Sequence, residues 1–236
     1  MARNKSQGRL FAIGDIHGCP DELRAMLNAI APQAGDTVVF IGDYIDRGPN
    51  ARDVVEQLLD LEQRGAETVF LKGNHEDMML SFMGLPGHYG DSFLFNGGIA
   101  TLDSYGVNER ELEHAIESIP EPHMRFLRRL ATSYLRPPYL FVHAGVLPTR
   151  QLYEQQVEDL LWIRQEFIFN IHNLGSTVVF GHTPLREVLL DLPYKIGIDT
   201  GLVYGGKLTC VEFSEGALYQ VSRGSREAKS RPLRSR

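Results

Sequence analysis

The chain has 236 residues, 43% of them hydrophobic, and a formal net charge of −6. This is enough apolar sequence for a large core, and the length favours one domain over two. No apolar run reaches the ~20 residues that cross a bilayer, and the basic N-terminus lacks the apolar region of a signal peptide. We therefore expect a globular monomer without a membrane anchor.

Charge divides the chain at about residue 222. Residues 223–236 hold six basic residues and one acidic residue, a net charge of +5 that leaves −11 on the remainder. An acidic body argues against nucleic acid as a partner. We predict one domain over residues 1–222 and a disordered basic tail over residues 223–236, with a weak contact to an anion as the alternative role of the tail.

Two cysteines, Cys19 and Cys210, make no disulfide framework. We expect both to be free thiols, and this cysteine usage suits a reducing cytoplasm.

The first ~80 residues repeat one pattern three times, in which a strand-like apolar run is followed by a glycine and then by metal-type ligands. The copies are LFAI before Gly-Asp-Ile-His-Gly at 14–18, TVVFI before Gly-Asp-Tyr-Ile-Asp-Arg-Gly at 42–48, and TVFLK before Gly-Asn-His-Glu at 73–76. Strand ends of this kind gather ligands at one edge of a sheet. The pattern therefore predicts that the three loops together form one catalytic site.

Helices are predicted between these strands. Pro20 fits a first helical position, with an apolar stripe from Leu23 to Ile30, and Asn50 fits the cap of a second helix that Gly65 would end. Short helical crossovers between strands imply parallel pairing.

The pattern loosens between residues 81 and 105, where glycines interrupt aromatic residues and indicate a substrate-facing or lid-like insertion more than regular core. Helices are predicted at 109–117, with Asn108 and Glu111 as a capping box, and at 121–131. Strands then resume at YLFV before His143, TVVF before His182, KIGI before Asp199, and the pair LTCVEF and ALYQVS. We expect an α/β fold in which two sheets form a sandwich with helices outside.

Six side chains that commonly ligate metals follow strand-like runs directly: Asp15, His17, Asp43, Asn74, His143 and His182. Mixed oxygen and imidazole ligands suit Mn, Fe or Zn more than calcium. They exceed what one tetrahedral ion needs, so we predict two divalent ions, with Mn first and Asp43 as the bridge. Two ions about 3.5–4 Å apart would supply a hydroxide nucleophile and clamp a phosphoryl group.

Phosphoryl transfer also needs a cation and a proton donor. Arg47, four residues after Asp43, can bind two phosphate oxygens with its planar guanidinium. His75, next to Asn74, is placed to protonate a leaving oxygen, and Asp46 is the carboxylate that could orient it.

At these residues the chain resembles the PPP family of metallophosphoesterases, which are calcineurin-like in fold. GDIHG, GDYIDRG and GNHE are similar to its signature segments, and His-Ala-Gly at 143–145 and Gly-His-Thr at 181–183 to its later histidine loops. The resemblance implies a first metal on Asp15, His17 and Asp43, and a second that shares Asp43. It also implies an acid pair of His75 and Asp46, and phosphate binding by Arg47 and by Arg164 in LLWIR.

The sequence is compatible with two enzyme activities that act on different substrates, and the fold alone does not distinguish them. The leading hypothesis is a Ser/Thr protein phosphatase similar to the phage-lambda group, and the alternative is a symmetrical diadenosine tetraphosphate hydrolase. Pro184 stands where many diesterases have a second histidine after Gly-His-x, which favours the PPP branch. A third class, a non-catalytic binding module, is disfavoured because the ligands and the acid pair are intact.

Ordinary structural roles compete with each assignment. Aspartate and asparagine often form turns or caps, a histidine can sit in a core, and arginines pair at surfaces. The ordered set of motifs favours the metal site. Asp199 and the turn Asn96-Gly97-Gly98 fit a turn role as well as a supporting role beside the site.

Overall fold

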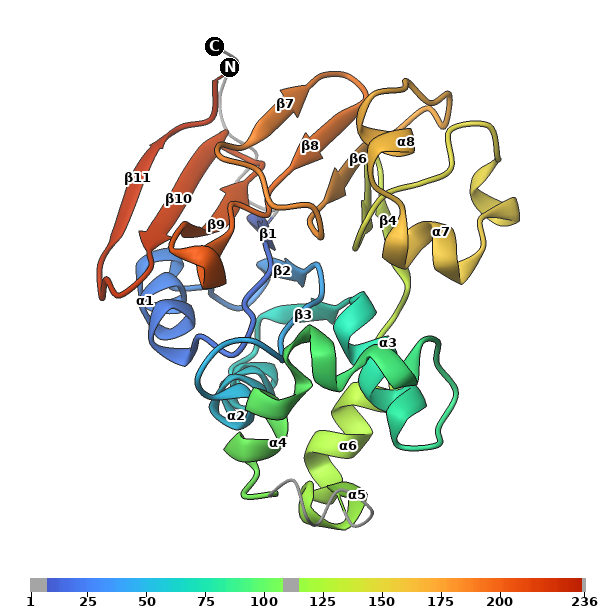
Figure 1. Ribbon diagram of the computed structural model, residues 1–236. Helices are drawn as coiled ribbons and strands as arrows, with labels where there is room; N and C mark the ends of the chain where they lie inside the picture. The colour runs from blue at the N-terminus through green and yellow to red at the C-terminus, as the bar shows by residue number, and fades with distance from the viewer. Residues whose placement is uncertain (1–7, 108–114, 235–236) are drawn as a thin grey trace.

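The computed structural model describes residues 8–107 and 115–234, which form two β-sheets packed face to face with helices on the outer faces (Figure 1). The first sheet has the strand order β11 (Ala228–Pro232), β10 (Ala217–Ser222), β9 (Lys207–Glu212), β1 (Leu10–Ile13), β2 (Thr37–Phe40), β3 (Glu67–Phe70). The second sheet has the order β4 (Ser133–Arg136), β5 (Tyr139–Val142), β6 (Thr177–Phe180), β8 (Lys195–Gly197), β7 (Leu189–Asp191). The expected α/β sandwich is confirmed.

Each sheet has a parallel centre. β1, β2 and β3 pair in parallel in the first sheet, as do β5, β6 and β8 in the second. The outer pairs, β9 with β1 and β10 in one sheet and β4 with β5 and β7 with β8 in the other, are antiparallel. Because parallel strands end on the same edge, the loops after them meet at one place.

Alternation along the strands builds three apolar layers. In β1, Phe11 and Ile13 pack towards helices, whereas Leu10 and Ala12 pack in the layer between the two sheets. In β6, Val179 joins that central layer and its neighbours Val178 and Phe180 face the opposite side. The period of two residues in a strand therefore places each central strand between two apolar surfaces, which explains its uninterrupted apolar sequence.

The first two predicted helices form where the caps indicate. α1 (Pro20–Ile30) begins at Pro20, and α2 (Ala51–Glu62) is capped by the Asn50 side chain, which accepts a hydrogen bond from the Asp53 N–H at 3.0 Å. α2 ends before Gly65, which instead lies in the turn to β3 with φ of 89°.

Several segments of the middle of the chain are helical. They are α3 (Asn74–Phe82), the short turns η1 (Gly90–Ser92) and η2 (Leu94–Gly98), α4 (Ile99–Ser104), α5 (Ala115–Ser118) and α6 (Glu121–Arg128). The stretch expected to be irregular, residues 81–105, thus contains helical turns. The capping box of Asn108 and Glu111 lies outside the described residues, as does most of the helix predicted at 109–117.

The second sheet is followed by smaller elements. η4 (Leu152–Glu154), α7 (Val157–Trp162) and α8 (Gln165–Ile168) lie between β5 and β6, and η5 (Leu202–Tyr204) precedes β9. Within the described chain, no helix is both long and apolar enough to span a membrane.

The tail is the main correction to the sequence prediction. Residues Ala228–Pro232, expected to be disordered, form β11, which pairs antiparallel with β10 from Ala217↔Pro232 to Val221↔Ala228. Pairing uses backbone groups, so a basic sequence with a proline can still add to an open edge, and such residues are typical of edge strands. The turn before β11 is held by Glu22 of α1, whose Oε1 accepts from Arg223 Nη1 at 2.6 Å and from the Gly224 N–H at 2.7 Å.

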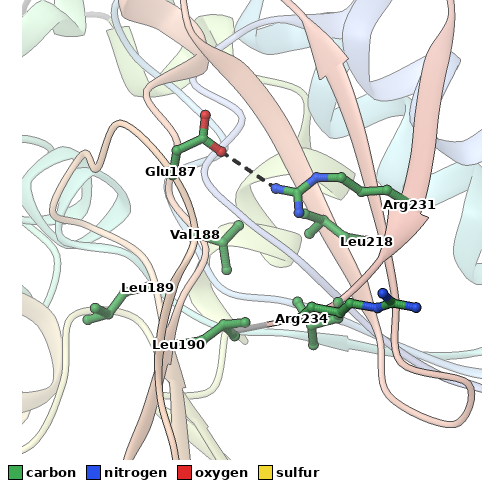
Figure 2. A pocket seen from close by; sticks show the side chains of 8 residues that line it. Glu187, Val188, Leu189, Leu190, Leu218, Arg231 and Arg234 are labelled. Carbon is green, nitrogen blue, oxygen red and sulfur yellow. Dashed lines mark ion pairs between the residues drawn. The ribbon is translucent and has the colours of Figure 1, made fainter. Parts of the chain in front are cut away.

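A cavity of about 260 Å³ lies between β7 and the β10–β11 hairpin (Figure 2). Glu187 and Arg231 face each other across it at 3.5 Å, above apolar side chains that include Leu190 and Leu218. None of the predicted site residues lines it.

Candidate metal centre

The loops after five strands bring all six predicted ligands together. Asp15 and His17 follow β1, Asp43 follows β2, and Asn74 begins α3 after β3; the second sheet contributes His143 after β5 and His182 after β6. Each is at most 4% exposed. The site therefore lies where the carboxyl ends of the parallel strands of both sheets meet.

Four of these side chains form one close group. Asn74 Oδ1 lies 2.8 Å from His182 Nδ1 and 3.0 Å from His143 Nε2, which is itself 3.4 Å from Asp43 Oδ1. His143 Nδ1 bonds the Ile41 carbonyl at 2.8 Å, so it carries the proton and Nε2 presents a lone pair. The lone pair of His143 Nε2 and the oxygens of Asn74 and Asp43 thus face one another with no proton between them, an arrangement that a cation would satisfy.

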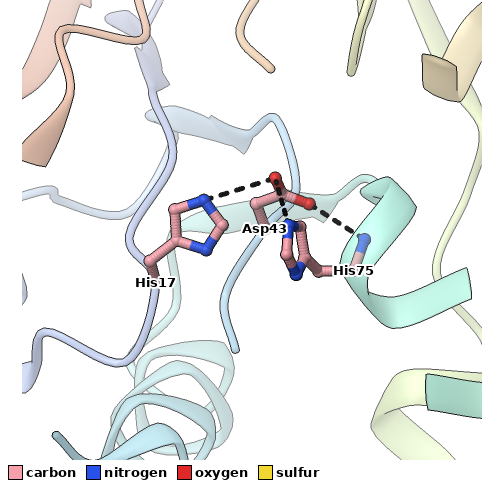
Figure 3. Close-up of side chains that lie close together, drawn as sticks. All are labelled: His17, Asp43 and His75. Carbon is pink, nitrogen blue, oxygen red and sulfur yellow. Dashed lines mark hydrogen bonds and ion pairs between the residues drawn. The ribbon is translucent and has the colours of Figure 1, made fainter. Parts of the chain in front are cut away.

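The second oxygen of Asp43 faces a different set of residues. Asp43 Oδ2 lies 3.5 Å from His17 Nε2 and 4.0 Å from His75 Nε2 (Figure 3). His17 Nδ1 bonds the Ile45 carbonyl at 2.9 Å, which again leaves Nε2 as a lone pair. Asp15 approaches through its carboxylate, which accepts the backbone N–H of His182 at 3.0 Å. Asp43 therefore offers one oxygen to each of two groups of ligands.

The ionisation states favour metal binding. Burial lowers the pKa of His17 to about 3, and burial also lowers the pKa values of His143 and His182. Burial alone would raise the pKa of Asp43, but the surrounding histidines outweigh it and lower that pKa. Uncharged imidazoles and an ionised Asp43 are the forms that bind metal ions, and the direction of each shift favours them.

Buried acidic groups also accumulate beside this centre. Burial, Asp199 and Asp43 raise the pKa of Asp15 well above its usual value, and burial raises that of Asp199 to about 6. Asp199 is 4% exposed and accepts the Gly201 N–H at 2.9 Å. It therefore stabilises a turn and also lies beside the site, as both interpretations of its sequence position predicted. Carboxylates that repel one another in a buried place are stabilised by cations, so the residues fit divalent metal ions.

His75 is paired in a different way from the other histidines. Its Nδ1 lies 2.6 Å from Asp46 Oδ2, while Asp46 Oδ1 accepts the Thr101 hydroxyl at 2.6 Å. Burial lowers the pKa of His75, but the carboxylates of Asp43 and Asp46 outweigh it and raise that pKa. A histidine that keeps its proton at neutral pH is a poorer metal ligand but can serve as a general acid, although its Nε2 also lies near Asp43.

Both predicted arginines lie beside the ligands. Arg47 Nη1 is 2.9 Å from His17 Nε2, and Arg164 Nη1 donates to the His182 carbonyl at 3.2 Å. One arginine therefore accompanies each of the two groups of ligands.

The backbone of these loops is unusual. Of the described non-glycine residues, seven have positive φ, and five of them are in the motifs: His17, Asp43, Asp46, Arg47 and His182. Such conformations cost of order 1–3 kcal/mol each and cluster at functional sites. Two glycines that lie against the predicted ligand carboxylates cannot be replaced. A Cβ on Gly73 would collide with Asp43 Oδ1, and one on Gly181 would collide with Asp15 Oδ1.

Two supporting residues were not identified from the sequence. Glu76, fully buried, accepts backbone N–H groups from the Asp43 loop, and Thr101 bonds Asp46 from a helix 55 residues further on. The position of Glu76 inside the third motif was a signal that could have indicated its role. Nothing in the sequence marks Thr101.

The family model for calcineurin-like phosphoesterases matches residues 8–206, and the chain belongs to that family. The resemblance predicted from the motifs is confirmed. Together with the ligand groups around Asp43, membership makes the chain a metallophosphoesterase that uses divalent metal ions.

Curated relatives match along nearly their whole length. The asymmetrical bis(5'-nucleosyl)-tetraphosphatase PrpE of Oceanobacillus iheyensis is 26% identical, over 91% of this chain and 92% of that protein. The symmetrical bis(5'-nucleosyl)-tetraphosphatase of a Janthinobacterium strain is 24% identical, over 89% and 95%. Serine/threonine-protein phosphatase 1 of Salmonella typhimurium is 29% identical, over 87% and 92%.

Solved structures give the same picture of the fold. A crystal structure named as that of a "putative diadenosine tetraphosphatase" is 27% identical with a TM-score of 0.68, and the match covers 94% of this chain and 96% of that one. A cold-active protein-tyrosine phosphatase from a Shewanella species has a TM-score of 0.63 at 18% identity, covering 97% and 81%, and is similar in fold.

Proposed function

We propose that the chain binds two divalent ions, one on each side of Asp43. Asp15, His17 and Asp43 would hold the first ion, and Asp43, Asn74, His143 and His182 the second. The observation that carries this proposal is the position of the two Asp43 oxygens, each 3.4–3.5 Å from a histidine nitrogen of a different group. Mn²⁺ is the metal we expect, with Fe and Zn as alternatives of similar ligand preference.

The side chains around this centre have separate tasks in phosphoryl transfer. When bound, the two ions would supply an activated water and neutralise phosphoryl oxygens. Arg47 and Arg164, one beside each ligand group, would bind and orient the other phosphate oxygens through their guanidinium groups. His75, kept protonated by Asp46, would donate its proton from Nε2 to the leaving oxygen.

As substrate we propose a dinucleoside tetraphosphate, whose phosphoanhydride bond would be cleaved. Support comes from the full-length similarity to both asymmetrical and symmetrical tetraphosphatases and to a structure of the same naming at 27% identity. This proposal reverses the order of the two hypotheses that the motifs gave, since the protein phosphatase was the first of them.

A phosphoprotein is the second candidate substrate. It is favoured by the Salmonella protein phosphatase, which at 29% is more identical to this chain than either tetraphosphatase described above. The metal ligands and the acid pair serve an anhydride and a phosphomonoester alike, so they do not distinguish the two.

A comparison of the two substrates under the same conditions tests the proposal. With Mn²⁺ and equal enzyme, we expect kcat/KM for diadenosine tetraphosphate to exceed that for a phosphoserine peptide by about tenfold or more, which corresponds to ~1.4 kcal/mol of transition-state stabilisation. Asp43→Asn is the matched inactive control, because it removes one charge at nearly constant volume. Faster hydrolysis of the peptide would overturn the choice of substrate, and full activity of Asp43→Asn would overturn the metal centre.

A further inference from the structure

An exposed aromatic ring lies directly against one of the site arginines. The Arg47 guanidinium carbon is 5.5 Å from the centroid of the Tyr204 ring, while Nη1 of the same arginine contacts His17. Tyr204 is 62% exposed. Arg47 therefore connects the buried ligands to an aromatic surface in solvent.

Tyr204 is held in place although it is exposed. It ends the short turn η5, in which Leu202 is only 2% exposed and anchors the segment in the core. The Tyr204 N–H donates to the Gly201 carbonyl at 3.0 Å, and Gly206 donates to the same carbonyl at 2.9 Å. The Tyr204 backbone is therefore fixed, so ordering the ring against a ligand involves only its two side-chain torsions.

A second turn that touches Arg47 carries another exposed ring. The Gly97 carbonyl in η2 accepts the Arg47 N–H at 3.1 Å, and a Cβ on Gly97 would lie 2.7 Å from Arg47 Cγ. Phe95 in this turn is 94% exposed, whereas Phe93, two residues before it, is fully buried. Both segments packed on Arg47 thus present an aromatic side chain to solvent.

We propose that Tyr204, assisted by Phe95, is the stacking surface for a nucleobase of the substrate. A nucleoside attached to a phosphate held by Arg47 would extend from the buried site towards solvent, where these rings lie. Bases stack on aromatic side chains through their π faces, and a tyrosine does not need to distinguish one base from another. This inference rests on the proposed function, because a phosphopeptide carries no base.

A pair of ligands that differ only in the base provides the test. AMP and ribose 5-phosphate are compared as inhibitors of para-nitrophenyl phosphate hydrolysis by the Mn²⁺-loaded enzyme. We expect the wild type to prefer AMP, and Tyr204→Ala to reduce that preference by about 5- to 150-fold. Tyr204→Phe should retain the preference because it keeps the ring, and Phe95→Ala should reduce it in part.

The controls separate this inference from the proposed function. Tyr153→Ala, which removes an 86% exposed ring from η4, should leave the preference for AMP unchanged. Equal inhibition by AMP and ribose 5-phosphate, or the same preference in Tyr204→Ala as in the wild type, would overturn the stacking site. If the wild type cleaves no diadenosine tetraphosphate but the preference for AMP is still lost in Tyr204→Ala, only the proposed substrate is refuted and the stacking site stands. If Tyr204→Ala instead slows hydrolysis of a phosphoserine peptide alone, Tyr204 contacts a peptide, and the inference is overturned.

Discussion

Glu76 holds the loop that carries Asp43. Its Oε2 accepts the backbone N–H of Asp43 at 3.0 Å and that of Gly73 at 2.8 Å, and its Oε1 accepts the Tyr44 N–H at 2.8 Å. One buried carboxylate therefore joins the second and third motifs and fixes the carboxylate that faces both ligand groups.

Replacing Glu76 by glutamine should weaken metal binding. The amide keeps one accepting oxygen but turns an NH₂ group towards backbone N–H donors, so the Asp43 loop loses a support. We expect a 10- to 100-fold higher Kd for Mn²⁺, as is typical of residues that orient ligands, and a loss of about 1–3 kcal/mol in the free energy of unfolding. Calorimetric titration and urea unfolding measure the two effects. Exposed Glu166→Gln is the control, and unchanged Mn²⁺ affinity in Glu76→Gln would contradict the prediction.

Loss of the proposed acid should depend on the leaving group. His75→Asn is expected to reduce kcat on a phosphoserine peptide by roughly 10²–10⁴-fold, because an alkoxide must be protonated as it leaves. Diadenosine tetraphosphate releases a phosphate oxygen, which with a pKa near ~6 needs little protonation, so its loss should be smaller. Para-nitrophenyl phosphate should behave like the dinucleotide. Equal losses on all three substrates would assign His75 to another role.

Removal of metal should affect both activity and stability. Chelation is expected to abolish hydrolysis, and Mn²⁺ should restore it. Because the ions would bind the folded chain and not the unfolded one, Mn²⁺ at 100 times its Kd should stabilise folding by about 2.7 kcal/mol for each bound ion. Thermal unfolding with and without Mn²⁺ measures this difference. Asp43→Asn serves as the comparison, since its Tm should respond much less to Mn²⁺; an equal rise in both proteins would point to binding elsewhere.

Asp36 should make stability depend on acid pH. Burial raises its pKa, but hydrogen bonds from the Arg9 guanidinium and from backbone N–H groups of Gln33 and Arg9 outweigh burial and lower that pKa. The folded state therefore favours the ionised form. Its contribution is complete above the unfolded value of ~3.9 and is lost as pH falls through the lowered folded value.

Urea unfolding of Asp36→Asn measures this contribution. We expect the variant to be less stable by about 1–3 kcal/mol at pH 7, with a difference that shrinks in strongly acidic solution. Asp21→Asn is the matched control, because Asp21 pairs with Arg24 in an exposed contact at 2.9 Å and should cost less than ~1 kcal/mol. A difference for Asp36→Asn that stays constant with pH would show that its charge is not responsible.

Local sequence patterns correctly predicted most of the central strands and the first two helices. The runs before Asp15, Asp43 and Asn74 are strands because continuous apolar sequence suits strands buried on both faces, and α1 and α2 begin at the proline and asparagine that favour helix starts. The short strands β4 and β7 and the edge strand β11 were missed. Polar or charged residues interrupt their sequences, and all three lie at sheet edges, where they form because a neighbouring strand offers unpaired backbone groups.

The sequence by itself determined which side chains are available for phosphoester chemistry, because strand, glycine and ligand follow one another within each motif. Only the tertiary structure decided how they meet. Asp43 lies within 3.5 Å of histidines from both sheets, Thr101 reaches Asp46 across 55 residues, and Tyr204 reaches Arg47 from the other half of the chain. Such contacts depend on how two sheets pack and where their strands end, which local sequence patterns do not encode.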